Sequence, residues 1–331
     1  MEVVYFFRKP RIKANFSIEK VFKLVAKNLP DIIFYKMVTV NLLSNGFINR
    51  LIIGFQVFLS KSQVNHVTGD IHFACLFLPP KRTVLTIHDI GFLNMYSGLK
   101  KIILNQFWLQ LPCRWCAAIT TVSEATKNEI LHVLPSIAHK IFVIPNPVPE
   151  HFHYSPRPFR KQSPTILQIG TKPNKNVIRL VKALQGIPCT LEIIGELTDE
   201  LTTELEKCDI KYVSSINLDE QTLIDKYKES DIVVFVSTHE GFGLPIIEAN
   251  AIGRVVLTSN VSSMPEIGGN AAHYVNPYDV ASIRAGLRVL IDDEERRNQL
   301  LMNGRENIKR FEPKHIAEKY AILYSRMLSD L

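Results

Sequence analysis

The sequence predicts an α/β protein built from two doubly wound domains, and three observations lead to this prediction. At 331 residues the chain is long enough for two domains of ordinary size, each with its own core. Short runs rich in Val, Ile and Leu alternate with helical stretches, as in parallel sheets whose strands are buried on both faces. A proline-rich segment at 145–164 interrupts this alternation, which then begins again.

The first half of the chain predicts a first domain over residues 1–155. One helix is expected to start after Ser123, whose hydroxyl can accept a hydrogen bond from the free amides of a helix start. Glu124 lies in its first turn, where the helix dipole favours a negative charge. The other helices are expected at 17–28, 47–59 and 99–116. The strands are expected at 31–35, 64–68, 83–87 and 118–122.

The second half predicts a second domain over residues 156–312. Its strands are expected at 165–170, 189–194, 211–213, 232–236, 255–257 and 273–275, with a helix at 176–185. Residues 313–331 contain an amphipathic helix that we expect to pack back on the first domain. Two such Rossmann-like domains would place a ligand cleft between the carboxyl ends of their strands.

The composition is typical of a globular protein without a membrane span, with 46% hydrophobic and 21% charged residues. The most apolar early stretch, 51–59, is far shorter than the roughly 20 residues of a spanning helix, which predicts a core or interfacial helix. No cleavage-site pattern follows the N-terminus, so we expect a cytoplasmic protein. Cys113 and Cys116 have C-x-x-C spacing without a second pair, which favours buried thiols over a zinc or redox site.

Positive charge is concentrated in the first half of the chain. Residues 1–150 contain 17 Lys and Arg against 8 Asp and Glu, whereas residues 151–331 contain 22 against 24. A basic face can attract a nucleic acid, an anionic membrane surface or a phosphorylated small molecule, and charge alone does not choose among them. A solvated basic surface with no partner is also compatible with these counts.

The segment 238–249 is the most informative motif. It follows a buried strand as a tight loop and continues as a helix that starts at Pro245. Gly241 and Gly243 let the backbone approach a ligand, and the free amides of the helix start suit a diphosphate. Glu240 lies in the loop, and Glu248 lies one turn inside the helix, where a carboxylate suits ribose hydroxyls. Two surface carboxylates on an ordinary strand-loop-helix unit are the alternative.

Glu240 and Glu248, with Gly-Phe-Gly-Leu-Pro between them, resemble the E-x7-E motif of the retaining GT-B glycosyltransferases of the large family 4. The resemblance implies a GT-B fold, with two Rossmann-like domains facing across a cleft. It also implies that Glu240 lies by the donor sugar and that Glu248 holds the ribose. The backbone of Phe242, Gly243 and Leu244 would contact the sugar and the phosphate.

A second segment, 167–176, resembles the family landmark that grips the donor diphosphate. Gly170 and Thr171 end its strand, and Lys175 fits the family lysine. Asn174 stands where relatives have an arginine, so one phosphate contact is lost or comes from another cation such as Lys172. Lys175 could also be a solvated lysine, but a cation at a helix start opposes the helix dipole and favours an anionic partner.

In the first domain, His88 and Asp89 follow a predicted strand at its carboxyl end. The resemblance implies that His88 contacts the donor near its sugar and diphosphate, and that Asp89 orients His88 or contacts the acceptor. A structural role for His88 is the alternative. Asp70 and His72 follow the preceding strand and are expected at the same rim, on the acceptor side.

Many relatives have a glycine-rich loop after the first strand, but this chain has Arg8, Lys9, Arg11 and Lys13 there. We expect this basic loop to recognise an anionic acceptor, such as a lipid-linked diphosphate glycan at the inner face of an anionic membrane. No nucleic-acid partner is expected.

The chain contains no Asp-x-Asp, so we expect neither a metal nor a cofactor. The leaving diphosphate would be stabilised by Lys175 and the helix start. By resemblance, the function is transfer of a hexose-type sugar from a nucleotide-diphosphate sugar to a glycan or lipid-linked acceptor in bacterial surface polysaccharide synthesis. An epimerase-like enzyme and a non-catalytic nucleotide-sugar-binding protein are the alternatives.

Overall fold

A computed structural model describes residues 1–10, 17–91 and 96–329. The described chain folds into two compact units, one of which contains Met1–Pro147 and the C-terminal helix, and the other Val148–Glu312. The change of unit thus falls between Pro147 and Val148, whereas the sequence placed it between residues 155 and 156. Residues 148–155 belong to the second unit because the Ser155 amide donates to the Ile252 carbonyl over 3.0 Å and the Phe152 ring packs on Tyr227.

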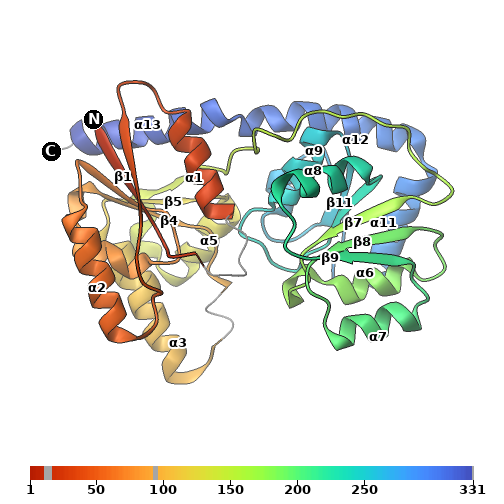
Figure 1. Cartoon of the computed structure of the whole chain (residues 1–331), viewed down its shortest axis with the longest axis horizontal. Helices are drawn as coiled ribbons and strands as arrows, with labels where there is room; N and C mark the ends of the chain where they lie inside the picture. The colour runs from red at the N-terminus through yellow and green to blue at the C-terminus, as the bar shows by residue number, and fades with distance from the viewer. Residues whose placement is uncertain (11–16, 92–95, 330–331) are drawn as a thin grey trace. The chain divides into compact units, whose positions relative to one another are not determined.

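The first unit contains a six-stranded sheet in the order β2-β1-β3-β4-β5-β6, with every neighbouring pair parallel (Figure 1). Its strands are β1 Glu2–Phe7, β2 Phe34–Thr39, β3 Val64–Val67, β4 Thr83–Ile87, β5 Ala118–Thr121 and β6 Ile141–Val143. Its longer helices are α1 Ser17–Lys27, α2 Gly46–Leu59, α3 Gly98–Leu104, α5 Glu124–Val133 and α13 Pro313–Ser329. A π-helical segment, η4 Asn105–Gln110, joins α3 to the short helix α4 Leu111–Trp115.

Strand β1 shows how this sheet is covered. Val3, Tyr5 and Phe7 pack with α1 and α13 on one face, while Val4 and Phe6 pack with α2 on the other. Because both faces are covered, the strand reads as a continuous apolar run. The pairing of Glu2 with Phe34 sets the position of β2, which therefore lies later in the chain than the apolar run 31–35 had predicted.

The second unit contains a parallel sheet in the order β12-β11-β10-β7-β8-β9. Its strands are β7 Thr165–Ile169, β8 Thr190–Ile194, β9 Tyr212–Ser215, β10 Ile232–Phe235, β11 Val255–Ser259 and β12 His273–Val275. Its helices are α6 Val177–Leu184, α7 Asp199–Lys207, α8 Glu220–Glu229, α9 Leu244–Ile252, α10 Met264–Gly268, α11 Val280–Asp292 and α12 Glu294–Asn307. The predicted fold of two doubly wound α/β domains is therefore confirmed.

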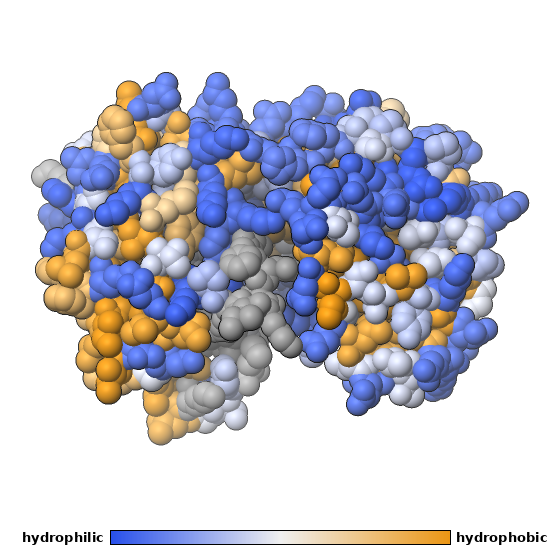
Figure 2. Space-filling model, in the orientation of Figure 1, coloured by the Kyte–Doolittle hydropathy of each residue, from blue (hydrophilic) through white to orange (hydrophobic). Residues whose placement is uncertain are grey.

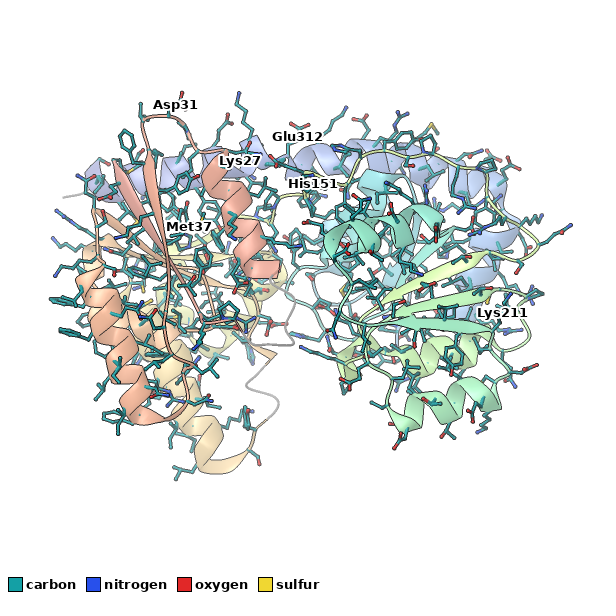
Figure 3. The ribbon with its side chains drawn as sticks, in the orientation of Figure 1. Lys27, Asp31, Met37, His151, Lys211 and Glu312 are labelled. Carbon is teal, nitrogen blue, oxygen red and sulfur yellow. The ribbon has the colours of Figure 1, made fainter. Side chains whose placement is uncertain are left out.

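Helix α13 is part of the first unit through a buried polar network. The Tyr324 hydroxyl donates to the Tyr5 hydroxyl over 3.1 Å and lies 2.7 Å from Nδ1 of His66. Nε2 of His66 lies 2.7 Å from the Thr86 hydroxyl. Because Tyr324 uses its proton on Tyr5, Nδ1 of His66 is the donor to Tyr324. Met37 of β2 packs against the apolar cluster around this network (Figure 3).

Among the described residues, none of the helices combines the length and the apolar character needed to cross a bilayer. All five cysteines are free and buried, including Cys113 and Cys116. Burial raises the pKa of the Cys113 thiol, which makes it a poor metal ligand or nucleophile at neutral pH.

We predict that Tyr324→Phe destabilises the first unit by about 1–3 kcal/mol, because it leaves the buried Tyr5 hydroxyl and His66 Nδ1 without their partner. Both tryptophans, Trp108 and Trp115, belong to this unit, so their fluorescence during urea unfolding reports on it. Tyr35→Phe, on the exposed β2, is the matched control. Equal midpoints for Tyr324→Phe and the parent would contradict the structural role of the network.

A second prediction concerns pH. Burial lowers the pKa of His66 to about 3, and it also lowers the pKa values of His72 and His88. The unfolded chain binds protons at these residues below about pH 6.5, whereas the folded unit does not until lower pH. Stability is therefore complete above pH 6.5 and falls toward lower pH, by up to about 1.4 kcal/mol per pH unit for each histidine. Tryptophan fluorescence during urea unfolding, repeated at pH values between 7.5 and 5, measures how the free energy of unfolding changes with pH. A urea midpoint that does not change with pH would contradict the prediction.

Candidate functional site

In the second unit the strand order reverses between the neighbouring strands β7 and β10. The connections that leave the carboxyl ends of these strands run to opposite sides of the sheet, which is where doubly wound sheets bind ligands. The two connections are joined directly, because the Thr238 amide donates to the Asn174 carbonyl over 2.8 Å. The motifs 167–176 and 238–249, separate in sequence, therefore meet at one place.

An ion pair lies at this meeting point. Nζ of Lys175 is 2.7 Å from Oε1 of Glu240, and the two side chains are 18% and 15% exposed. The side-chain amide of Asn174 donates to the same oxygen over 3.1 Å and to the His239 carbonyl over 3.0 Å. The Lys175 ammonium also lies 4.6 Å from the centre of the Phe235 ring. Glu240 and Lys175, which are predicted to act on the donor sugar and diphosphate, are therefore already paired with each other without a ligand.

The Glu240 loop is fixed by two serines that sequence reasoning missed. The Glu240 amide donates to the Ser262 hydroxyl over 3.2 Å, and the Ser263 hydroxyl donates to the carbonyls of Glu240 and Phe242. Both serines follow β11, the strand next to β10. Their position at the carboxyl end of an adjacent strand was the available signal.

Gly243 sets the start of helix α9. Its φ of 110° is open to glycine, and an added Cβ would lie 3.2 Å from Ile246 Cδ1 and 3.4 Å from Phe235. Leu244 and Pro245 follow as the first helical residues, so the helix start presents its amides at this strand end. The Phe242 side chain is buried against Phe311, which leaves its backbone as the part able to meet a ligand.

Gly170 lies against the Lys175 side chain, and Thr171 follows it. An added Cβ on Gly170, whose φ is 83°, would lie 3.1 Å from Cε of Lys175, so the lysine side chain passes closely over this glycine. The Thr171 hydroxyl donates to the Glu196 carbonyl over 2.7 Å and ties this loop to the one after β8. Lys172, the suggested replacement for the missing arginine, is exposed.

Glu248 lies on α9 and accepts a hydrogen bond at Oε2 from the Tyr227 hydroxyl of α8. Tyr227 is fully buried, and burial together with Glu248 holds its pKa well above the usual value. The phenol therefore stays protonated and orients the carboxylate. Sequence reasoning did not identify Tyr227, because a tyrosine on a neighbouring helix carries no motif.

In the first unit, the strand order reverses between β1 and β3, whose carboxyl ends lead to Arg8 and Asp70. These two side chains form an ion pair with each other, and Nε of Arg8 lies 3.8 Å from Oε1 of Glu19. Lys9 is exposed. Arg11 and Lys13, the other members of the predicted basic loop, lie outside the described residues.

His88 lies at the end of β4, with Nε2 donating to the Thr68 carbonyl over 2.8 Å. Burial lowers its pKa, so the ring is neutral at pH 7. Asp89 is exposed and accepts a bond from the Gly91 amide, so the Thr68 carbonyl rather than Asp89 orients His88.

His72 differs from its expected place at the rim. Its side chain is buried in a 3₁₀ segment, and Nδ1 donates to the Trp108 carbonyl over 2.7 Å. Phe73 and Cys75 of the same segment are buried in the core, which carries His72 inward with them. Asp70 is the member of this pair that stays at the strand end.

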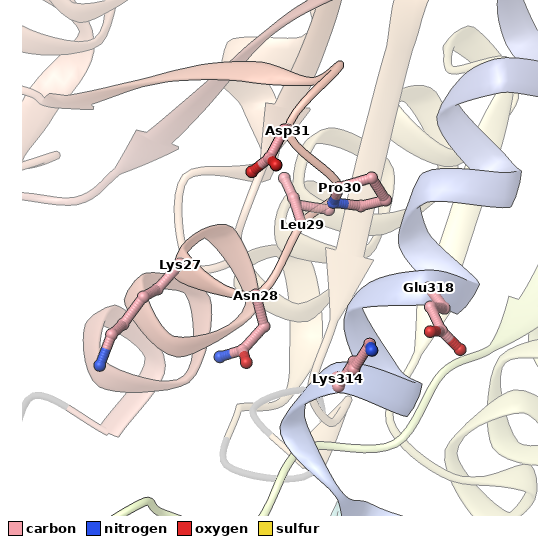
Figure 4. A pocket seen from close by; sticks show the side chains of 7 residues that line it. All are labelled: Lys27, Asn28, Leu29, Pro30, Asp31, Lys314 and Glu318. Carbon is pink, nitrogen blue, oxygen red and sulfur yellow. The ribbon is translucent and has the colours of Figure 1, made fainter.

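A pocket of the first unit opens between the end of α1 and the start of α13 (Figure 4). It is lined by Lys27, Asn28, Leu29, Pro30, Asp31, Lys314 and Glu318. It contains none of the predicted site residues and lies away from the carboxyl ends of the strands. Within the described part of the chain, no group of three or more His, Cys, Asp and Glu is arranged to hold a metal ion.

Two family models and several known proteins match this chain. Residues 154–307 match the family model "Glycosyl transferases group 1", and residues 59–152 match "Glycosyltransferase Family 4". O-antigen chain mannosyltransferase B of Escherichia coli is 26% identical, over 72% of this chain and 70% of that protein. Serotype-specific mannosyltransferase WbdA of E. coli is also 26% identical, over 65% of this chain, but the match spans 30% of the length of WbdA.

Among solved structures, Anabaena Alr3699/HepE in complex with UDP and glucose has the same fold, with a TM-score of 0.77. The likeness covers 98% of this chain and 99% of that one, at 15% sequence identity. The two family models together span most of the chain, and each falls largely within one of its two units. The chain therefore belongs to the family 4, group 1 glycosyltransferases and has their GT-B fold.

Proposed function

We propose that this glycosyltransferase retains the anomeric configuration and moves a hexose-type sugar from a nucleotide-diphosphate sugar to a glycan or lipid-linked acceptor in bacterial surface polysaccharide synthesis. The observation that supports this most directly is the Lys175–Glu240 pair beside the start of α9. A cation and a helix start suit a diphosphate, and a carboxylate beside them suits the sugar.

On this proposal the donor is held by the second unit. Lys175 and the first amides of α9 would bind the diphosphate, and Glu248, oriented by Tyr227, would bind the ribose hydroxyls. Gly170 and Gly243 leave room for the backbone to approach the ligand. The names of the mannosyltransferase relatives make a mannosyl donor the first to test, and the UDP and glucose bound to Alr3699/HepE make UDP-glucose the second.

The proposed reaction is attack by an acceptor hydroxyl on the anomeric carbon, from the face that the nucleotide leaves. The bond from that carbon to the diphosphate oxygen breaks through an oxocarbenium-like state, and the hydroxyl proton passes to a donor phosphate oxygen. Fixed positive groups at Lys175 and α9 would stabilise the diphosphate without a metal. Glu240 as a covalent nucleophile is the alternative, and the two donors already bonded to its Oε1 favour a positioning role.

The first unit would recognise the acceptor. Arg8 is already paired with Asp70, so an anionic acceptor would compete with that carboxylate for Arg8. Lys9 is exposed, so it could bind an anion without breaking the Arg8–Asp70 ion pair. The lipid-linked diphosphate glycan that we propose would bring its charge to this loop. His88, neutral and fixed by Thr68, is proposed to contact the donor near its sugar and diphosphate.

A non-catalytic nucleotide-sugar-binding protein is a second candidate, and one observation favours it. Asn174 stands where the family resemblance predicts an arginine, and its amide donates to the His239 carbonyl and the Glu240 carboxylate. Incubation of the full chain with labelled nucleotide sugars separates the two functions. Turnover of one donor supports the transferase, and tight binding without turnover supports the second candidate.

We predict that Glu240→Gln and Lys175→Ala each lower kcat at least about 100-fold, because each removes a fixed charge at the reacting group. The matched control is the exposed pair of Glu306 in α12 and Lys309 just after that helix, which has the same 2.7 Å separation. Lys309→Ala and Glu306→Gln are expected to leave turnover unchanged.

Parent-like turnover in either site variant, with unchanged thermal stability, would contradict the assignment. A chelator supplies a further arm of the same assay. Undiminished turnover in excess EDTA is expected, and loss of turnover that added divalent metal restores would overturn the metal-independent mechanism.

We also predict that replacing Arg8, Lys9, Arg11 and Lys13 together by Ser raises the KM for an anionic acceptor by roughly tenfold or more and weakens its dependence on salt, because charge attraction is removed. The KM for the nucleotide sugar should not change. Lys207→Ser with Lys211→Ser, both exposed in the second unit, tests for a general charge effect. An unaltered acceptor KM in the loop variant would rule out this acceptor site.

A further inference from the structure

Two neighbouring helical segments of the first unit leave much of their apolar surface in solvent. Six side chains, all between 61% and 73% exposed, illustrate this surface. They are Phe47, Ile48, Phe55 and Leu59 of α2, and Leu99 and Ile102 of α3. We call this surface the α2–α3 face, and Figure 2 shows apolar residues gathered over these helices. Monomeric soluble proteins rarely leave a large contiguous apolar patch without a partner.

The inner side of α2 accounts for its place in the fold. Ile53, Gly54 and Val57 are buried, and an added Cβ on Gly54 would lie 2.5 Å from the Phe77 ring. This close contact fixes which side of the helix faces the sheet. The exposed residues therefore cannot turn inward without displacing the buried ones.

The α2 helix contacts the segment that continues α3. The Arg50 guanidinium of α2 stacks 4.5 Å from the centre of the Trp108 ring in η4, the segment that continues α3. The Lys61 ammonium just after α2 lies 3.5 Å from the centre of the Phe58 ring. Two cations of these segments thus lie against aromatic rings.

The two segments that carry this surface contain cations and no acids. Residues 32–69 and 90–123, which contain both helices, include no Asp or Glu at all. They include Lys36, Arg50, Lys61, Lys100, Lys101 and Arg114. Apolar segments whose only charged side chains are cations complement a layer that is apolar inside and anionic at its boundary.

We propose that the α2–α3 face inserts into an anionic lipid surface, with its apolar side chains among the acyl chains and its cations at the headgroups. A helix with this character lies in the plane of a membrane interface and does not span it. A second copy of the chain fits less well, because a two-fold dimer would bring like cations against one another. The proposal rests on the proposed function in one respect, since a lipid-linked acceptor would lie at the surface that this unit binds.

Sedimentation of the full chain with lipid vesicles tests the proposal. Vesicles of phosphatidylcholine alone are compared with vesicles in which part of this lipid is replaced by phosphatidylglycerol. The parent protein is expected to bind the anionic vesicles more tightly, and added salt is expected to weaken this binding. Failure of the parent to bind anionic vesicles would overturn the proposal.

The decisive variant carries Ile48→Gln, Phe55→Gln, Leu99→Gln and Ile102→Gln, because Gln keeps helix propensity while removing apolar area. Its partition onto anionic vesicles is expected to fall at least about 100-fold. The matched control replaces four exposed apolar residues elsewhere, Ile216, Tyr278, Met302 and Ile322, by Gln and is expected to bind as the parent does. Parent-like binding by the first variant, or an equal loss in the control, would contradict the proposal.

Two further readouts separate this proposal from others. Turnover of the donor with a water-soluble acceptor should be unchanged in the α2–α3 variant. If the parent binds vesicles but turns over no donor, the proposed function is refuted while the proposal of lipid binding is supported. Analytical ultracentrifugation reports on self-association. A parent dimer that the variant converts to monomer, with vesicle binding intact in both, would assign the face to a second copy and overturn the lipid proposal.

Discussion

The candidate donor site in the second unit depends on one constraint, the reversal of strand order between β7 and β10. Two parallel strands with their connections on opposite sides leave their carboxyl ends open, and the loops that follow can approach each other there. This brings Lys175 and Glu240 within 2.7 Å although they lie far apart in the sequence. Removing charges from water is costly, so the pair needs further hydrogen bonds, which Asn174 supplies to the Glu240 carboxylate while Ser263 fixes its backbone.

The same rule acts in the first unit with a different order of strands. There the reversal lies between β1 and β3, and the ion pair at the strand ends joins Arg8 to Asp70. Helix α13 completes this unit from the far end of the chain, because its Tyr324 closes the polar network around His66 in the core. Without that hydroxyl, a donor nitrogen and the Tyr5 hydroxyl would be buried unpaired. The C-terminal helix is therefore part of the first core in the same sense as β1.

Sequence patterns predicted what depends on local periodicity and on short motifs. The buried strands and the glycine at the start of α9 follow from apolar periodicity and loop composition, whereas the ion pair of Lys175 with Glu240 was found only in the structure. Contacts between distant elements were not predictable in this way. The Tyr227 bond to Glu248, the Ser262 and Ser263 bonds to the 240 loop, and the burial of His72 depend on which helices pack together. The start of β2 depends likewise on pairing with β1 rather than on its own apolar run.

The buried side chains of α2 are needed for folding, whereas its exposed apolar side chains are not. Covering the sheet takes an apolar inner side, and Ile53, Gly54 and Val57 provide it. Polar residues at the exposed positions would satisfy the same fold, since a surface helix needs one apolar stripe and not two. The outer residues Phe47 and Phe55 add apolar area that the fold leaves in water, at a free-energy cost relative to polar side chains when the protein is unbound. Their place among cations, with acids missing from both segments, is therefore explained by contact outside the unit and not by the core within it.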